Sequence, residues 1–408
     1  MAHRKIFQRD FTQHWFPKMI PYSRQVITWG DVLRVAHTLK FKNLTQGSAI
    51  ERFENSISKY VGSKYAVAVS SATAGLHLSH LALDVPHGSI IATSPISFVA
   101  SANTALYAGL NPIFIDIDAD SGNISVESFK NEIVKHDIKT LVPVHYAGAP
   151  CEMKQFYEIC KREGIHIIED AAHALGSTYP TGEKVGSCKF SDLTVFSFHP
   201  VKNITTGEGG VITTNNELLY ESLLKLRSHG ISKNKENFKN IRLSSTAGVI
   251  NPWYYEMSTL GFHYRLTDIQ ASLGYSQMKK LKKFLNKRNR ISKRYDKAFN
   301  KNKFITPIQI GMRKYSAKHL YGIKINFNEI GISKNDIMYK LKKVGITTQV
   351  HYLPIPLHAY YQSLGYNVEK LPNALEFYNQ ILSIPLYPTL SRFKQRKVII
   401  ALKTIIKK

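Results

Sequence analysis

The chain has 408 residues, of which 43% are hydrophobic, and a net charge of +26. This is the composition of a folded protein with room for two domains, and it excludes a disordered chain. No apolar run approaches the length of a membrane span, which argues against membrane insertion.

The opening MAHRKIFQRDFTQHWFPKM lacks the apolar stretch of a signal peptide. Cys151, Cys160 and Cys188 are an odd number of cysteines without the spacing of a metal site. Such usage suits a reducing compartment without disulfides. We therefore expect a cytoplasmic protein that binds no metal.

From Tyr65 onward, short apolar runs alternate with stretches that have helical periodicity. Strands are expected over 65–70, 89–94, 112–117, 141–148 and 165–170, and helices over 71–83, 98–109, 125–137 and 153–163. This alternation predicts an α/β fold with a mostly parallel sheet covered by helices. Such sheets bind ligands at the carboxyl ends of their strands.

The stretch from Thr194 to Thr214, TVFSFHPVKNITTGEGGVITT, predicts two strands joined by a polar, glycine-rich loop. The loop carries a single lysine, Lys202. A lysine delivered in this way can be held still and aimed at a carbonyl carbon, as a Schiff-base site requires. A hairpin with a solvated lysine is the alternative interpretation of this stretch alone.

Beyond Gly230 a polar stretch, 231–252, predicts a loop, and 253–270 leads into a helix with a capping box at Thr267 and Gln270. From Phe304 the pattern is a strand in HLYGIKINF, a helix in NDIMYKLKKVG, a strand in ITTQVHY and a final helix. We expect an N-terminal extension over 1–24, a large domain over 25–280 and a smaller α+β domain over 281–408.

The positive charge is concentrated between Lys279 and Lys303, where there are 12 Lys or Arg and one acidic residue, Asp296. Nucleic-acid binding is one explanation of such a run. However, the run has few aromatic residues, and we find no zinc-finger, helix-turn-helix or RNA-binding signature in the sequence. We interpret it as a solvated helix face and expect no nucleic-acid partner. Attraction of an anionic nucleotide substrate is a further interpretation.

Three features follow expected strands in the order Ser71-Ala72-Thr73, Asp170 and Lys202. Hydroxyls and N–H groups where a helix begins can bind phosphate. An aspartate at a strand end can pair with the protonated ring nitrogen of pyridoxal phosphate. Each feature alone has an ordinary structural explanation, such as a helix cap for the serine or the aspartate. Together they are typical of a pyridoxal-phosphate enzyme with the aspartate aminotransferase fold (fold type I).

Specific motifs support this interpretation: LTQGSAIERFENSISKYVGSKYAVAVSSATAGLHL, SFVASANTALYAG, PVHYAGAPCEM, EDAAHALGS, SFHPVKNITTGEGG and GFHYRLTDIQASLG. In these segments, and over nearly the whole chain from about Ile20, the sequence resembles the DegT/DnrJ/EryC1/StrS family of sugar-nucleotide aminotransferases. IPYSRQ, WYYEM and HYLPIPLHAYY are most similar to the branch of pseudaminic acid synthesis. That branch uses glutamate to aminate C4 of UDP-4-keto-6-deoxy-N-acetyl-β-L-altrosamine.

The resemblance implies a role for each matching residue. Lys202 would bond to the cofactor and then move the proton, and Asp170 would keep the pyridine nitrogen protonated. The remaining cofactor contacts would come from His173, Ala72, Thr73, Phe98, Ser197 and His263, and the sugar-nucleotide pocket from Tyr22, Tyr146, His351 and His358. A homodimer with shared active sites is also implied.

The chain departs from the family pattern at two positions. Ala72 stands where the family usually has glycine, which requires a negative φ at that residue. His263 stands where the family usually has an asparagine that reaches the cofactor phosphate of the neighbouring subunit.

The alternatives are an aminotransferase for another nucleotide-linked keto sugar (legionaminic acid, perosamine or 4-amino-4-deoxyarabinose type), a sugar dehydratase of the same family, and a non-enzymatic regulator. The dehydratases carry histidine in place of the lysine, so Lys202 argues against that alternative.

Overall fold

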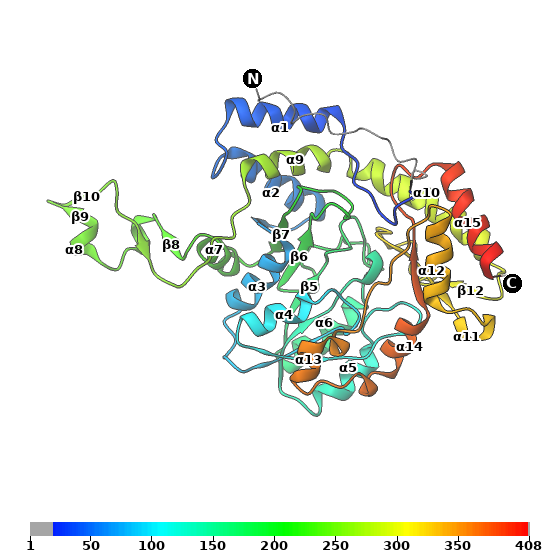
Figure 1. Cartoon of the computed structure of the whole chain (residues 1–408). Coiled ribbons are helices and arrows are strands. Elements are labelled where there is room, and N and C mark those ends of the chain that lie inside the picture. Colours follow the sequence, from blue (N-terminus) through cyan, green and yellow to red (C-terminus); the bar gives the residue numbers. More distant parts are fainter. Residues whose placement is uncertain (1–18, 407–408) are drawn as a thin grey trace, which may run out of the picture.

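The computed structural model describes residues 19–406. Residues 1–18 of the predicted N-terminal extension, which contain most of the segment tested for a signal peptide, lie outside this range. A seven-stranded sheet with the order β1-β7-β6-β5-β4-β2-β3 forms the centre of the molecule (Figure 1). The strands are β1 (Tyr65–Val69), β2 (Ile90–Thr93), β3 (Asn111–Phe114), β4 (Ile138–Val142), β5 (His166–Asp170), β6 (Leu193–Ser197) and β7 (Gly210–Thr214).

The sheet is mostly parallel, as the alternating pattern predicts. β2 pairs in parallel with β3 and β4, and the β4–β5 and β5–β6 pairs are also parallel. β7 pairs antiparallel with both β6 and β1. The hairpin expected over Thr194 to Thr214 is therefore present, and its loop carries Lys202.

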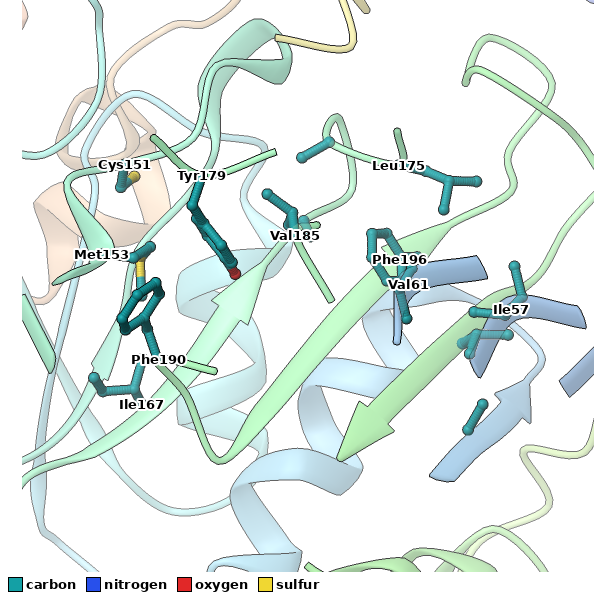
Figure 2. Close-up of a cluster of buried hydrophobic side chains, with 14 of the residues drawn as sticks. Ile57, Val61, Cys151, Met153, Ile167, Leu175, Tyr179, Val185, Phe190 and Phe196 are labelled. Carbon is teal, nitrogen blue, oxygen red and sulfur yellow. The ribbon is translucent and has the colours of Figure 1, made fainter. Parts of the chain in front are cut away.

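Helices cover both faces of this sheet. Alternate residues of each strand point to opposite faces, so each face carries apolar side chains that the helices bury. Val67 and Val69 share one core with α3 (Ala72–Ala82), α4 (Ala100–Tyr107) and α7 (Glu217–Leu226). Ala66 and Ala68 face the other core, which contains residues of α2 (Ser48–Val61), α5 (Val126–Ile133), α6 (Met153–Glu163) and α9 (Asp268–Met278). Figure 2 shows part of this second core around Tyr179, Phe190 and Phe196. The αβα layering confirms the predicted fold class.

A second, smaller core lies at the C-terminal end of the chain. Its sheet has the order β12-β13-β14, with β12 (Ile305–Pro307), β13 (Tyr321–Ile325) and β14 (Ile381–Ile384). The helices of this half are α10 (Leu281–Phe299), α11 (Phe327–Ile330), α12 (Lys334–Lys343), α13 (Ala359–Ser363), α14 (Pro372–Gln380) and α15 (Arg392–Ile406). α10 joins the two halves, because Leu281 packs in the large core and Phe299 in the small one.

The strand expected in ITTQVHY is wrong. This run makes only single-residue bridges, Ile346 with Ile20 and Gln349 with Ser383. The third strand of the small sheet is β14, which pairs antiparallel with β13. The β-branched residues of the run suggested a strand, but Val350, His351 and Tyr352 line a cavity instead.

The segment between α7 and α9 extends away from the body of the molecule (Figure 1). The sequence predicted a plain loop over 231–252, whereas this arm contains two short antiparallel ladders, β10-β9 and β11-β8. Its elements are β8 (Ile231–Ser232), α8 (Ile241–Ser244), β9 (Ser245–Thr246), β10 (Val249–Ile250) and β11 (Glu256–Met257).

The remaining helical elements include α1 (Trp29–Phe41), which packs against α9. Short 3₁₀ turns are η1 (Tyr146–Gly148), η2 (Lys235–Asn237), η3 (Ile355–Leu357) and η4 (Val368–Lys370). Among residues 19–406, none of the helices is both long and apolar enough to cross a bilayer.

Candidate active site

A cavity of about 600 Å³ lies at the carboxyl ends of the large sheet's strands. This is where a mostly parallel sheet is expected to bind its ligand. Nine predicted site residues line it: Tyr22, Ala72, Thr73, Phe98, Asp170, His173, Ser197, Lys202 and His351. The structure thus brings together residues that are more than 300 positions apart in the sequence.

Asp170 is the last residue of β5, and its carboxylate is oriented by two donors. The Ser101 hydroxyl donates to Asp170 Oδ2 at 2.6 Å, and the Ala172 N–H donates to Oδ1 at 3.1 Å. Ser97 Oγ lies 2.7 Å from Ser101 Oγ and extends this chain of hydroxyls. Hydrogen bonds at both oxygens hold the carboxylate in one orientation. Asp170 is therefore suited to face a protonated nitrogen.

Lys202 lies in the loop between β6 and β7, and backbone bonds fix that loop. The Lys202 N–H donates to the His199 C=O at 2.9 Å, and the Thr206 N–H donates to the Phe198 C=O at 3.0 Å. Burial lowers the pKa of the Lys202 amine to about 8, and the Asp170 carboxylate opposes part of this shift. An amine with a pKa near 8 is partly unprotonated at neutral pH and can act as a nucleophile.

Three imidazoles and a phenol surround this pair. The His173 ring lies 4.3 Å from the His319 ring between centroids, and His173 Nε2 lies 3.1 Å from the Tyr352 hydroxyl. Burial, followed by the positive charge of Lys202, holds the pKa of His173 well below its usual value. The same two causes lower the pKa of His351 to about 3. These imidazoles are neutral at pH 7 and add no positive charge beside Lys202.

The N-terminal end of α3 forms another wall of the cavity. Ser71 caps this helix, because its Oγ accepts the Ala74 N–H at 3.0 Å. Ala72 begins the helix and is not among the residues with a positive φ, so it meets the requirement for a negative φ at this position. A Cβ added at Gly210 would lie 2.7 Å from Ser71 O and 2.8 Å from Ala72 N. Glycine at 210 therefore permits the close approach of β7 to this turn.

Phe98 lies at the mouth of the cavity. Its side chain remains 60% exposed, and its ring centroid is 6.5 Å from that of Tyr352. An exposed aromatic ring at this position is available to stack on a planar ligand.

Three predicted residues do not line this cavity in the single chain. Tyr146 is 1% exposed, and its hydroxyl donates to the backbone carbonyl of His351, so it supports the cavity wall from behind. His358 lies next to α13, outside the lining. His263 is exposed and stacks on His229 with 5.3 Å between ring centroids.

Sequence reasoning missed several residues that line the cavity: His199, Glu208, His319, Gln349 and Tyr352. It also missed Ser101, which lies outside the lining but holds the Asp170 carboxylate. Ser101 follows Ser97 by four positions, and the chain turns into α4 between them so that their hydroxyls meet. Tyr352 directly follows His351, which is a predicted site residue. His319 precedes β13, and no local sequence signal indicates that it lies in the cavity.

Known proteins resemble the chain over nearly its whole length. A family model described as the DegT/DnrJ/EryC1/StrS aminotransferase family matches residues 27–403. The chain is 40% identical over 369 residues to UDP-4-amino-4,6-dideoxy-N-acetyl-beta-L-altrosamine transaminase of Campylobacter jejuni subsp. jejuni serotype O:23/36 (strain 81-176), which covers 90% of this chain and 92% of the relative.

Two solved structures are similar as well. One is Helicobacter pylori PseC, an aminotransferase involved in the biosynthesis of pseudoaminic acid, with a TM-score of 0.87 and 32% identity over 96% of this chain and 100% of that one. The other is the PMP form of a putative sugar aminotransferase from Streptococcus pneumoniae. It has a TM-score of 0.85 and 30% identity over 95% of this chain and 99% of that one.

Proposed function

Because the chain belongs to the DegT/DnrJ/EryC1/StrS aminotransferase family, we propose that it transfers an amino group from glutamate to C4 of UDP-4-keto-6-deoxy-N-acetyl-β-L-altrosamine. The observation that carries this proposal is the pairing of Asp170 and Lys202 in one cavity. One is a hydrogen-bonded carboxylate and the other an amine whose pKa burial lowers to about 8. A relative with 40% identity is named for the 4-amino sugar nucleotide that this reaction would form.

Pyridoxal phosphate is the cofactor, and the residues present fit it. The hydroxyls of Thr73 and Ser197 and the first N–H groups of α3 offer donors to a phosphate group. Gly210 leaves the space beside that turn free of a side chain. When bound, the cofactor supplies an electron sink for the carbon that loses a proton.

The two central residues have separate tasks in this proposal. The Asp170 carboxylate holds a proton on the ring nitrogen of the cofactor, and the Ser101 and Ala172 donors keep it oriented. The Lys202 Nζ would hold the cofactor and, when it is free of that bond, would move the proton to or from the reacting carbon. Burial supports both tasks, because it excludes water and keeps the amine partly unprotonated.

The sugar nucleotide would enter on the side of the cavity that is lined by residues near the start of the chain and before α13. Tyr22 and His351 line this side, with ring centroids 5.4 Å apart, and Gln349 adds an amide. Tyr146 would act by holding the His351 backbone. His358 would reach the substrate only at the outer edge of the cavity, because it lies beyond the lining.

A homodimer is part of this proposal. The arm between α7 and α9 exposes apolar side chains that the described part of the chain does not cover, among them Ile241, Val249, Trp253 and Leu260. Burying such side chains against a second copy would be favourable. His263 is exposed near the base of this arm. In the dimer it would reach towards the cofactor phosphate of the second copy.

A substrate panel tests the proposal. The purified protein is incubated with pyridoxal phosphate, glutamate and UDP-, GDP- or dTDP-linked 4-keto sugars, and the amino sugar is identified by mass spectrometry and NMR. We expect the UDP-linked altrosamine derivative to be aminated fastest. Faster turnover of a GDP- or dTDP-linked sugar would instead favour an aminotransferase for another nucleotide sugar.

The absorbance spectrum separates the remaining alternatives. Pyridoxal phosphate bound to a lysine absorbs near ~420 nm. A protein that binds the cofactor without this band, or that dehydrates the sugar without consuming glutamate, would contradict the aminotransferase proposal. A regulator without enzymatic activity would turn over none of the sugars.

A further inference from the structure

Glu169, the residue before Asp170 on β5, is a buried carboxylate to which neither the sequence patterns nor the proposed mechanism gives a role. Successive residues of a strand point to opposite faces of the sheet, so Glu169 lies behind the cavity. Its side chain is 0% exposed. Four donors share its two oxygens: His145 Nε2 at 2.7 Å, the Tyr179 hydroxyl at 2.6 Å, the Ser191 hydroxyl at 2.5 Å and the Thr194 hydroxyl at 2.9 Å.

The hydrogen bonds fix the proton on His145. His145 Nδ1 accepts the Cys151 N–H at 3.0 Å, and a backbone N–H can only donate. The proton of the imidazole is therefore on Nε2, directed at Glu169, and the ring is neutral. Together with the three hydroxyls, His145 completes a set of four donors, which is the full capacity of an ionised carboxylate.

Glu169 thus carries a negative charge in a dry environment. The four hydrogen-bond donors stabilise this charge against the cost of its burial. Figure 2 shows Tyr179 among apolar neighbours, and its ring centroid is 5.2 Å from that of Phe190. Within residues 19–406, neither Lys nor Arg forms a salt bridge with Glu169. In such surroundings a charge acts over a longer distance than it does in water.

His145 connects this charge to the cavity. Its backbone N–H donates to the Asp170 C=O at 3.1 Å, while its side chain donates to Glu169. The Asp170 N–H donates in turn to the Pro143 C=O at 2.9 Å. A single residue after β4 therefore holds both the backbone of Asp170 and the side chain of Glu169.

We propose that Glu169 is a positioning residue for the aminotransferase reaction. Through His145 it fixes the end of β5 from which Asp170 projects, and its charge adds to the negative potential that keeps the ring nitrogen of the cofactor protonated. This inference rests on the proposed function, because it gives Asp170 a cofactor to face. Partners in a second layer around a reactive group act in this way by orienting it and tuning its basicity.

The test compares two buried carboxylates of the holoenzyme. Glu169→Gln keeps the size of the side chain and removes its charge. The control is Asp116→Asn, because Asp116 is also buried and accepts the backbone N–H groups of Asn373 and Ala374, but does not line the cavity. Three quantities are measured: the melting temperature of the apoprotein, kcat and KM, and the pH titration of the cofactor band near ~420 nm.

We expect Glu169→Gln to lower kcat roughly tenfold while KM stays within about twofold, as for other orienting partners of a reactive group. The pH midpoint of the cofactor band should fall, because loss of a nearby negative charge disfavours the protonated form. Asp116→Asn should lower the melting temperature and leave kcat and the midpoint unchanged. Equal kcat and midpoint changes in both variants would overturn the proposal, as would parent-like values in Glu169→Gln.

Should Glu169→Gln fail to fold, Tyr179→Phe removes one donor and leaves the charge buried but less stabilised. Because the charge stays, the midpoint should not fall, but kcat should fall, since the carboxylate is held less firmly, and a parent-like kcat would overturn the proposal. If the parent protein itself lacks the cofactor band, the proposed function fails and the role of Glu169 with it. If the parent has the band and Glu169→Gln matches it at every pH, only the role of Glu169 fails.

Discussion

Gly210→Ala is expected to damage the cofactor site through the backbone alone. Gly210 begins β7 and pairs with both Val69 and Ser197. The added Cβ would lie 2.7 Å from Ser71 C and O and 2.8 Å from Ala72 N, and these atoms are backbone. Real Cβ atoms do not approach so closely, so the turn before α3 must shift. Overpacking of this kind costs about 1–3 kcal/mol of stability.

The larger effect of this substitution is expected on the cofactor. If the shift breaks one hydrogen bond to the charged phosphate, the loss is about 1.5–3 kcal/mol, or roughly 10- to 150-fold in affinity. Gly311→Ala is the matched control, because nothing lies within 4 Å of its Cβ position and its φ is not left-handed. Restricting the unfolded chain there is expected to leave stability unchanged or to raise it by about 0.4–1 kcal/mol.

Equilibrium binding of pyridoxal phosphate to the apoproteins, together with thermal unfolding, decides this prediction. Gly210→Ala should bind the cofactor at least tenfold more weakly than Gly311→Ala does. Parent-like affinity in Gly210→Ala would show that the turn after β1 does not hold the phosphate, and the assignment of Ala72 and Thr73 would fall with it.

Four further predictions concern Lys202, Asp170 and His263. Lys202→Ala should abolish transamination and retain some non-covalent cofactor binding, since Asp170 and the phosphate turn remain; near-normal turnover would contradict this. Asp170→Asn should lower turnover more than cofactor retention, because an amide cannot hold the ring nitrogen protonated, and a rate within a few-fold of the parent would make Asp170 structural. Burial lowers the pKa of Lys202 to about 8 from 10.5. Burying the charged amine therefore destabilises the folded state fully below pH 8, and this destabilisation disappears as the pH rises to 10.5. Lys202→Met should therefore stabilise the apoprotein in urea at pH 7 by about 3 kcal/mol and not at pH 10.5, and an equal gain at both pH values would refute this. His263→Ala should weaken cofactor binding by about 1–3 kcal/mol while His263→Asn does not, and parent-like binding in His263→Ala would show that the imidazole does not touch the phosphate.

The features that the sequence predicts correctly are local ones. The hairpin that carries Lys202 and the position of Asp170 at the end of β5 follow from short apolar runs bounded by polar or glycine-rich residues. The capping box of α9 is equally local, and its Thr267 and Gln270 make the expected bonds. Each of these signals is contained in a few neighbouring residues, so the rest of the fold does not override it.

The features that the sequence does not predict depend on long-range packing. Ser101 and Asp170 are 69 positions apart, and nothing in either segment indicates that they share a hydrogen bond. His319 reaches the cavity only because the segment before β13 folds back onto the large sheet. The ITTQVHY run has the composition of a strand, but its side chains are needed on the cavity wall, and β14 takes its place in the small sheet.

The excess positive charge of the chain lies mostly outside the residues that line the cavity. Residues 281–408 contain 26 Lys and Arg against 5 Asp and Glu, so most of the net charge of +26 belongs to this C-terminal segment. Within the cavity the Lys202 amine faces the Asp170 carboxylate, and burial keeps His173 and His351 neutral by lowering their pKa. A cationic histidine beside Lys202 would depress the pKa of the amine further, and this arrangement avoids that. Attraction of an anionic nucleotide by the excess charge would extend over about a Debye length and weaken as salt is added.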